Sequence, residues 1–267
     1  MKPVIHFAHA NGVPSKVYQK LFDGLKDEYD IIYVPLLGPD KRYPIDNHWN
    51  SLTNQVIDSI VRQAKGRPVI GLGHSLGSVL TFQAALKRPE LFTQVIMLDP
   101  PLIMGKEALV LHFAKLFKLK ALDKMSPAGL SKRRRDHWES RAQAVELLRP
   151  KGFYRDFDAD CFQAYIDYAL TEDKARGGVE LTIPKQDEVE IFQTNPSLWW
   201  LPQQKPKRPV HLVVPEQSPF LPRKFPQQVK KKFGIPFTLT PGGHMFPLEH
   251  PVEVAALIKQ LIQQQSA

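Results

Sequence analysis

Continuous apolar runs alternate with segments of helical spacing along the first part of the chain. Predicted strands, rich in Val, Ile, Leu and Phe, fall at residues 4–8, 30–36, 68–72 and 94–98. Predicted helices, whose apolar side chains share one face, fall at residues 17–25, 49–64 and 76–86. Strands that are apolar throughout are typical of a parallel sheet buried on both faces. This order therefore predicts an α/β fold, with helices on both faces of a mostly parallel central sheet.

The same pattern returns near the end of the chain after a long interruption. Predicted strands lie at residues 210–214 and 237–240, and predicted helices at residues 226–233 and 252–263. The intervening segment is charged and shows no clear strand, and helices are expected near residues 106–121, 131–148, 159–171 and 187–193. A segment of this length is not structureless inside a compact domain. We therefore predict a core of residues 1–101 and 210–267 and an inserted helical cap at residues 102–209.

The composition is sufficient for a large α/β core, and the cysteine content is typical of a protein in a reducing compartment. The chain has 267 residues, 43% of them hydrophobic and 24% charged. Cys161 is the single cysteine, so no disulfide forms within the chain. The N-terminal segment is too short and too interrupted for a signal peptide, and no apolar run approaches the roughly 18 residues that span a bilayer. We expect a cytoplasmic protein without a transmembrane segment.

Positive charge is concentrated in clusters. The formal net charge is +9, and the basic residues gather at residues 115–124, 132–135, 205–208 and 230–232. Such clusters attract an anionic substrate, a nucleic acid or an acidic membrane surface, or they are solvated helix faces and linkers. No aromatic interleaving or nucleic-acid motif accompanies them, so we expect no nucleic-acid partner. A peripheral contact with an anionic surface stays open, as does recognition of an anionic group by residues 132–135 and Trp138.

The segment that carries most chemical information follows the predicted strand at residues 68–72. It reads Gly73-His74-Ser75-Leu76-Gly77, a G-x-S-x-G pattern between a strand and a helix. The glycines permit the close approach of strand and helix ends that pushes the Ser75 hydroxyl outward. The Leu76 amide would lie at the helix N-terminus, where free N–H groups and the helix dipole favour a developing negative charge.

Two further segments complete a family resemblance. His9-Ala10-Asn11-Gly12 follows the first strand, and Gly242-Gly243-His244 follows the last. With the elbow at residues 73–77, the chain resembles α/β-hydrolase family members that carry a helical cap, over nearly its full length. The resemblance implies the α/β-hydrolase fold, Ser75 as nucleophile and His244 as general base. Imidazole suits this task because its pKa lies near 6.5.

The acid that would orient His244 has two candidates. Family members often carry an aspartate shortly after the penultimate strand, and Ser218 stands at that place here. Asp99 ends the strand that follows the nucleophile strand, a position that some family members use. Glu216 lies two residues before Ser218. We predict Asp99 as the acid, with Glu216 as the alternative, because either carboxylate can orient the imidazole if it reaches it.

The resemblance also places the oxyanion hole and the surrounding histidines. Its two N–H donors would be Leu76 and Asn11, or Ala10 if the loop is shifted. His9 is expected to support this loop. His74 is expected to point away from the reacting centre and to serve packing.

Residue types exclude several relatives of this fold. Dehalogenases and soluble epoxide hydrolases use an aspartate where this chain has Ser75. No H-E-x-x-H or cysteine-rich spacing predicts a metal site, and Gly71, Gly73 and Gly77 lack the dinucleotide-binding spacing, so we expect no metal and no cofactor. The prediction is a serine hydrolase that cleaves a small-molecule carboxylic ester or related acyl substrate through an acyl-enzyme. The alternatives are a C–C bond hydrolase, an acyltransferase, a cofactor-free lyase or perhydrolase, and a non-enzymatic ligand-binding protein.

Overall fold

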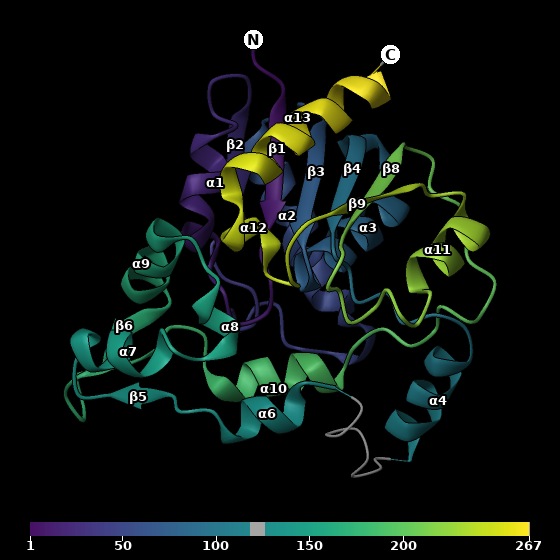
Figure 1. The fold of residues 1–267 in the computed structure, drawn as a ribbon. Helices are drawn as coiled ribbons and strands as arrows, with labels where there is room; N and C mark the ends of the chain where they lie inside the picture. Colours follow the sequence, from purple (N-terminus) through teal and green to yellow (C-terminus); the bar gives the residue numbers. More distant parts are fainter. Residues whose placement is uncertain (118–125, 267) are drawn as a thin grey trace.

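The computed structural model describes residues 1–117 and 126–266. Its centre is a sheet of six parallel strands in the order β2-β1-β3-β4-β8-β9 (Figure 1). The strands are β1 (Val4–Ala8), β2 (Asp30–Tyr33), β3 (Val69–His74), β4 (Phe92–Leu98), β8 (Val210–Pro215) and β9 (Phe237–Thr240). The predicted α/β fold with a parallel central sheet is confirmed.

Helices cover both faces of this sheet, because successive strand side chains point to opposite faces and both sets are apolar. Ile5 and Phe7 of β1 belong to one buried cluster, and Val4 and Ala8 belong to the other. The first cluster includes α1 (Gln19–Asp23) and α13 (Pro251–Ser266), and the second includes α2 (Asn50–Ala64), α3 (Leu76–Lys87) and α11 (Phe225–Phe233). Shorter helices connect them, namely η1 (Ser15–Tyr18), η2 (Asn47–Trp49), η3 (Pro89–Leu91) and α12 (Phe246–Glu249).

The segment between β4 and β8, which we call the insertion (residues 102–209), departs from the prediction. Helices alternate there with a small antiparallel sheet in the order β5-β7-β6. The expectation of an insertion without strands was therefore wrong. Its elements are α4 (Gly105–Leu116), α6 (Ala128–Arg133), β5 (His137–Trp138), α7 (Arg141–Leu148), α8 (Gly152–Arg155), α9 (Ala159–Tyr168), β6 (Leu170–Glu172), β7 (Val179–Leu181) and α10 (Lys185–Gln193).

A hairpin whose turn contains two glycines accounts for the unexpected strands. Gly177 and Gly178 both have positive φ and turn β6 back onto β7, and a side chain on Gly178 would come within 2.2 Å of the Trp138 oxygen in β5. Strand β5 interrupts the single helix expected at residues 131–148, and the helix expected at residues 159–171 ends before β6. Strands of two or three residues leave no alternation for a sequence pattern to reveal.

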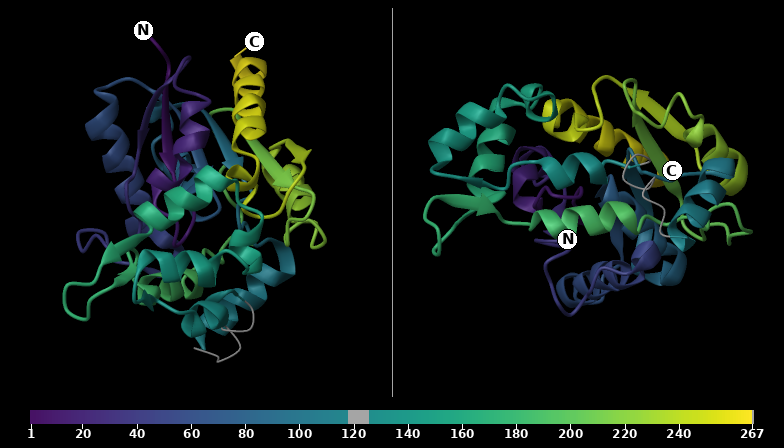
Figure 2. Two further views of the ribbon diagram at one scale, coloured as in Figure 1. Left: turned by 60° about the vertical axis from the view of Figure 1, so that its left-hand side comes forward. Right: turned by 90° about the horizontal axis from the view of Figure 1, so that it is seen from below.

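The insertion lies beyond the carboxyl ends of the parallel strands, and both chain termini lie at the opposite end of the sheet (Figures 1 and 2). Residues 118–121 of the expected helix at 106–121, and most of the basic cluster at residues 115–124, lie outside the described residues. The division into core and cap stays a prediction. Within residues 1–117 and 126–266, no helix is both long and apolar enough to cross a bilayer.

Candidate active site

The turn between β3 and α3 has the geometry that the G-x-S-x-G pattern predicts. Ser75 has φ 52° and ψ −116°, an unusual conformation for a residue with a side chain. A Cβ on Gly73 would lie 2.4 Å from the Gly77 backbone, and a Cβ on Gly77 would lie 2.0 Å from the Ala8 oxygen. Only glycine fits at both positions, so the pattern follows from steric contact between β1, β3 and α3.

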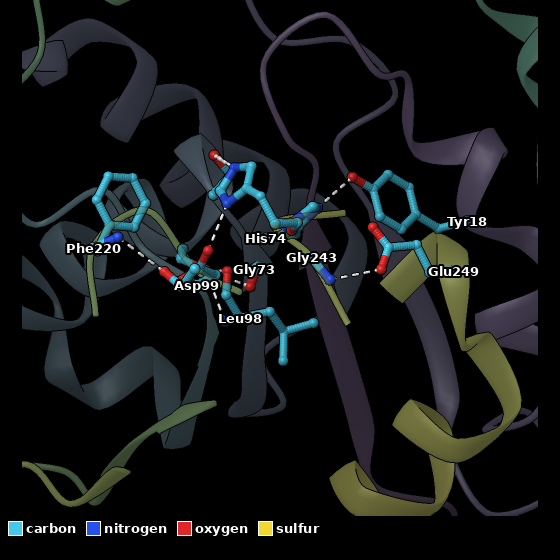
Figure 3. Close-up of polar contacts among 12 residues, drawn as sticks. Tyr18, Gly73, His74, Leu98, Asp99, Phe220, Gly243 and Glu249 are labelled. Carbon is cyan, nitrogen blue, oxygen red and sulfur yellow. Dashed lines mark hydrogen bonds and ion pairs between the residues drawn. The ribbon is translucent and has the colours of Figure 1, made fainter. Parts of the chain in front are cut away.

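Three side chains from distant segments meet above this turn. Ser75 Oγ lies 2.9 Å from His244 Nε2, and His244 Nδ1 lies 2.6 Å from Asp99 Oδ2. Asp99 is buried, with 1% of its surface exposed, whereas the His244 side chain is 29% exposed. Figure 3 shows Asp99 among its polar contacts. The hydroxyl, the imidazole and the carboxylate thus form one continuous chain of hydrogen bonds.

Donor and acceptor chemistry determines which atom carries each proton in these two hydrogen bonds. An ionised carboxylate only accepts, so the proton between Asp99 and His244 belongs to Nδ1. The Nε2 atom of His244 then keeps its lone pair and accepts the Ser75 hydroxyl proton. This is the tautomer that a general base acting on Ser75 requires.

Of the two candidate acids, the structure brings Asp99 to His244. Asp99 follows β4 with φ 42°, and its N–H donates to the Val213 oxygen at 2.8 Å. Its second carboxylate oxygen, Oδ1, accepts a hydrogen bond from Ser218 Oγ at 2.7 Å. The Glu216 side chain is exposed, and among the described residues it forms no hydrogen bond or ion pair with His244. Ser218, which occupies the usual aspartate position, therefore contacts Asp99 instead of replacing it.

The predicted oxyanion donors are Leu76, at the start of α3, and Asn11, on the loop after β1. Leu76 is the first residue of α3, so its N–H has no partner within the helix. On the loop after β1, the Ala10 N–H donates to the Tyr18 hydroxyl at 3.4 Å, which leaves Asn11 as the next donor along the loop. The Asn11 side chain is engaged elsewhere, because its Nδ2 donates to the Glu188 oxygen at 2.9 Å.

His9 supports this loop, as expected from the sequence. Its Nδ1 donates to the Ala10 oxygen at 2.7 Å, and its Nε2 accepts the Leu37 N–H at 2.8 Å. Burial lowers the pKa of His9 to about 4, so the ring stays neutral and keeps both hydrogen bonds.

His74 does more than the packing expected of it. Its Nε2 lies 2.8 Å from the backbone oxygen of His244, and its Nδ1 lies 2.7 Å from the Tyr18 hydroxyl. Figure 3 shows Tyr18 and His74 pointing toward one another, and also Gly243 facing Glu249. The Gly243 N–H donates to Glu249 Oε2 at 2.7 Å. His74 and Glu249 therefore both hold the loop that carries His244.

The insertion contacts the loop after β1 at Glu188, which also forms a largely buried ion pair with Arg134 inside the insertion. Glu188 of α10 accepts hydrogen bonds from Ser131 Oγ and from Arg134 Nη1, each at 2.5 Å, and its backbone oxygen holds Asn11. Arg134 also donates to Tyr154 and Tyr165. Because Arg134 is paired with Glu188 and Trp138 is buried, this part of the structure does not support recognition of an anionic substrate group by residues 132–135.

Sequence reasoning did not assign roles to Tyr18, Ser218, Glu188 and Glu249. The sequence did draw attention to Ser218, because it stands where family members often have an aspartate. The other contacts join residues far apart in the chain and have no local pattern. Among the described residues, no group of three or more His, Cys, Asp or Glu side chains is arranged to hold a metal ion.

Fold and comparison define the class of this protein. The model of the alpha/beta hydrolase family matches residues 7–257. The chain therefore belongs to the α/β-hydrolase family.

Individual relatives are distant. "Type I acyl-CoA thioesterase mpaH" of Penicillium brevicompactum is 24% identical over 216 residues, covering 68% of this chain and 47% of the relative. The chain thus spans about half the length of this curated relative. The structure of E-2-(acetamidomethylene)succinate hydrolase is 20% identical with a TM-score of 0.75, covering 98% of this chain and 92% of that one. The thioesterase domain from the curacin biosynthetic pathway is 18% identical with a TM-score of 0.71, covering 97% and 91%. At these identities the structural likeness shows the fold alone.

Proposed function

We propose that this protein is a serine hydrolase, which cleaves a carboxylic ester or related acyl substrate through an acyl-enzyme. One observation carries the proposal: Ser75 Oγ, His244 and Asp99 lie in a single hydrogen-bonded chain, with separations of 2.9 and 2.6 Å. A serine hydroxyl is a weak nucleophile by itself, and a neighbouring base that is oriented by an acid activates it.

In the first half-reaction, Ser75 Oγ bonds to the substrate carbonyl carbon while its proton moves to His244 Nε2. The carbonyl π electrons move onto oxygen, and we assign the N–H groups of Leu76 and Asn11 to stabilise the resulting oxyanion. Asp99 stays ionised and stabilises the imidazolium. When the carbonyl re-forms, the bond to the leaving group breaks, and His244 Nε2 returns its proton to that group.

In the second half-reaction, water takes the place of the serine. His244 Nε2 removes a proton from water as its oxygen bonds to the acyl carbon, and the same N–H groups stabilise the new oxyanion. The bond from Ser75 Oγ to carbon then breaks, and His244 returns the proton to Ser75. The products are a carboxylic acid and the released alcohol or thiol, and the enzyme is regenerated.

Two features support a small acyl substrate, ester or thioester. The reacting imidazole is partly exposed, which gives a small molecule access to it. The curated relative from Penicillium brevicompactum is named an acyl-CoA thioesterase, and a thioester is cleaved by the same steps with a thiol as the leaving group.

The test is hydrolysis of p-nitrophenyl esters of graded acyl length and of matched acyl thioesters. We expect turnover of at least one series by the wild type, and a loss of roughly 10³-fold or more in kcat for Ser75→Ala. Unchanged turnover in Ser75→Ala would refute the proposal. Activity on a vinylogous diketone, with none on esters or thioesters, would indicate a C–C bond hydrolase instead.

A further inference from the structure

Three loops meet at the carboxyl edge of the sheet. We call them the oxyanion loop (residues 9–12), the elbow (residues 73–77) and the histidine loop (residues 241–245). The catalytic steps proposed above require these loops to keep fixed separations, because a small displacement of a reacting group lowers the rate strongly. Two buried side chains outside those steps, Tyr18 and His74, form hydrogen bonds that join the loops.

The contacts run in sequence from one loop to the next. The Ala10 N–H of the oxyanion loop contacts the Tyr18 hydroxyl at 3.4 Å. That hydroxyl lies 2.7 Å from His74 Nδ1 on the elbow, and His74 Nε2 lies 2.8 Å from the His244 backbone oxygen. Tyr18 and His74 are both 0% exposed, so water does not compete for these bonds.

For a neutral His74, only one placement of protons satisfies all of these contacts. A carbonyl oxygen only accepts, so His74 Nε2 must carry the proton that binds the His244 oxygen. His74 Nδ1 then has a lone pair and accepts the Tyr18 hydroxyl proton. The Tyr18 oxygen in turn accepts the Ala10 N–H. Every donor in the series is matched to one acceptor, and no second tautomer of His74 keeps both of its bonds.

We propose that Tyr18 and His74 are positioning residues that fix the oxyanion loop and the histidine loop relative to the elbow. The inference rests on the proposed function, because it assigns these loops to the oxyanion and the general base. Tyr18 and His74 act through the backbone of Ala10 and His244, and they touch no reacting atom in the proposed steps.

Backbone hydrogen bonds anchor the histidine loop on either side of His244, from the Gln217 N–H to the Gly242 oxygen at 3.2 Å and from the Leu248 N–H to the Met245 oxygen at 2.8 Å. His74 adds a contact at the His244 backbone itself. Gly242 has φ +104°, a conformation that glycine adopts readily. The loop also carries His244, whose side chain is more exposed than that of Asp99. The Gly243 N–H is held by Glu249, one residue from the oxygen that His74 holds. Together these two bonds fix the backbone directly before and at His244.

The charge state of His74 agrees with this arrangement. Burial, and then the nearby His244, hold the pKa of His74 well below its ordinary value, against a smaller opposing effect of its hydrogen bond to the His244 backbone. A neutral His74 keeps the Nδ1 lone pair that binds Tyr18.

The test compares kcat, KM and thermal unfolding for substitutions of the two residues, using the p-nitrophenyl ester that the wild type hydrolyses best. Tyr18→Phe removes only the hydroxyl. His74→Leu removes both imidazole contacts, whereas His74→Gln keeps an N–H donor within reach of the His244 oxygen. His6→Leu is the matched control, because His6 is also 0% exposed and bonds through Nε2 to Ser59, outside the three loops.

We expect Tyr18→Phe and His74→Leu to lower kcat by about three- to tenfold or more while KM changes less than about twofold, as for a lost buried hydrogen bond that acts on the transition state. His74→Gln should recover most of the kcat lost in His74→Leu. His6→Leu should lower the unfolding temperature without lowering kcat of the folded protein.

Wild-type kcat in folded Tyr18→Phe would overturn the inference, and so would an equal loss in His6→Leu. Should His74→Leu not fold, Tyr18→Phe and His74→Gln still decide the question. Absence of ester and thioester turnover in the wild type would count against the proposed function itself, which separates the two failures.

Discussion

Asp99→Asn tests the identity of the acid with almost no change of shape. Asp99 has φ 42°, in the left-handed region that Asn tolerates better than most residues with a side chain. The substitution removes the negative charge that would stabilise the His244 imidazolium. Both oxygens of the Asp99 carboxylate can only accept hydrogen bonds. The Asn amide has one oxygen that accepts and one NH₂ group that donates.

Ser218 determines which way the new amide faces. The Ser218 hydroxyl accepts the Phe220 N–H at 3.1 Å and donates to Asp99 Oδ1 at 2.7 Å. The amide oxygen of the variant keeps this hydrogen bond if it stays beside Ser218, so the amide nitrogen turns toward His244 Nδ1. His244 then carries its proton on Nε2 and cannot accept the proton of Ser75. We expect kcat to fall roughly 10³- to 10⁴-fold, as for the same change in serine proteases.

The assay is ester hydrolysis near neutral pH, with Glu216→Gln as the matched control. Both variants neutralise one carboxylate on a loop at the same edge of the sheet, but Glu216 is exposed. We expect Glu216→Gln to keep kcat within about twofold of the wild type, and urea unfolding to confirm that both variants are folded. Loss of activity in Glu216→Gln, with an active Asp99→Asn, would refute the assignment of Asp99.

Further expectations concern stability. Gly77→Ala should lower the free energy of unfolding by about 3 kcal/mol or more in urea titrations, because its Cβ would lie 2.0 Å from the Ala8 oxygen. Gly66→Ala, whose Cβ would meet open space, is the control and should cost about 1 kcal/mol. An equally small cost for Gly77→Ala would contradict the steric argument. Burial lowers the pKa of His6 to about 3 and that of His9 to about 4, so the unfolded chain binds these protons first and stability falls as pH drops below 6.5. At pH 5, each histidine should lower the free energy of unfolding by about 2 kcal/mol relative to neutral pH. His6→Gln should remove the His6 contribution and so make the measured pH dependence less steep. Glu188→Gln should cost about 3 kcal/mol or more because it leaves Arg134 unpaired, whereas Arg88→Gln, in the exposed pair with Glu90, should cost about 1 kcal/mol or less in the same titration.

The core was predictable because its longer helices show helical apolar spacing and its strands are largely apolar runs. The elbow was predictable because backbone contacts require its glycines. Strands such as β3 and β4 are apolar over most of their length, and β9 has the bounds predicted for it. Gly73 and Gly77 are required by backbone contacts that no other residue tolerates. Sequence therefore indicated both the fold and the position of Ser75.

The remainder depends on tertiary contacts that leave no local pattern. Asp99 and Glu216 both follow strands that end at the same edge of the sheet, and only the loop paths decide which carboxylate meets His244. Tyr18 contacts His74 across 56 positions of sequence, and this contact exists only because η1 packs beside the elbow. The short strands of the insertion are equally hidden, because two or three residues cannot display an alternation.

The most direct test of the account is the site and rate of covalent modification by a fluorophosphonate, read by intact mass and peptide mapping. We expect a single adduct on Ser75, none in Ser75→Ala, and a labelling rate at least about 10³-fold lower in His244→Ala. An adduct on another residue, or labelling of Ser75 at the wild-type rate without His244, would contradict the claim that Ser75, His244 and Asp99 act as one unit.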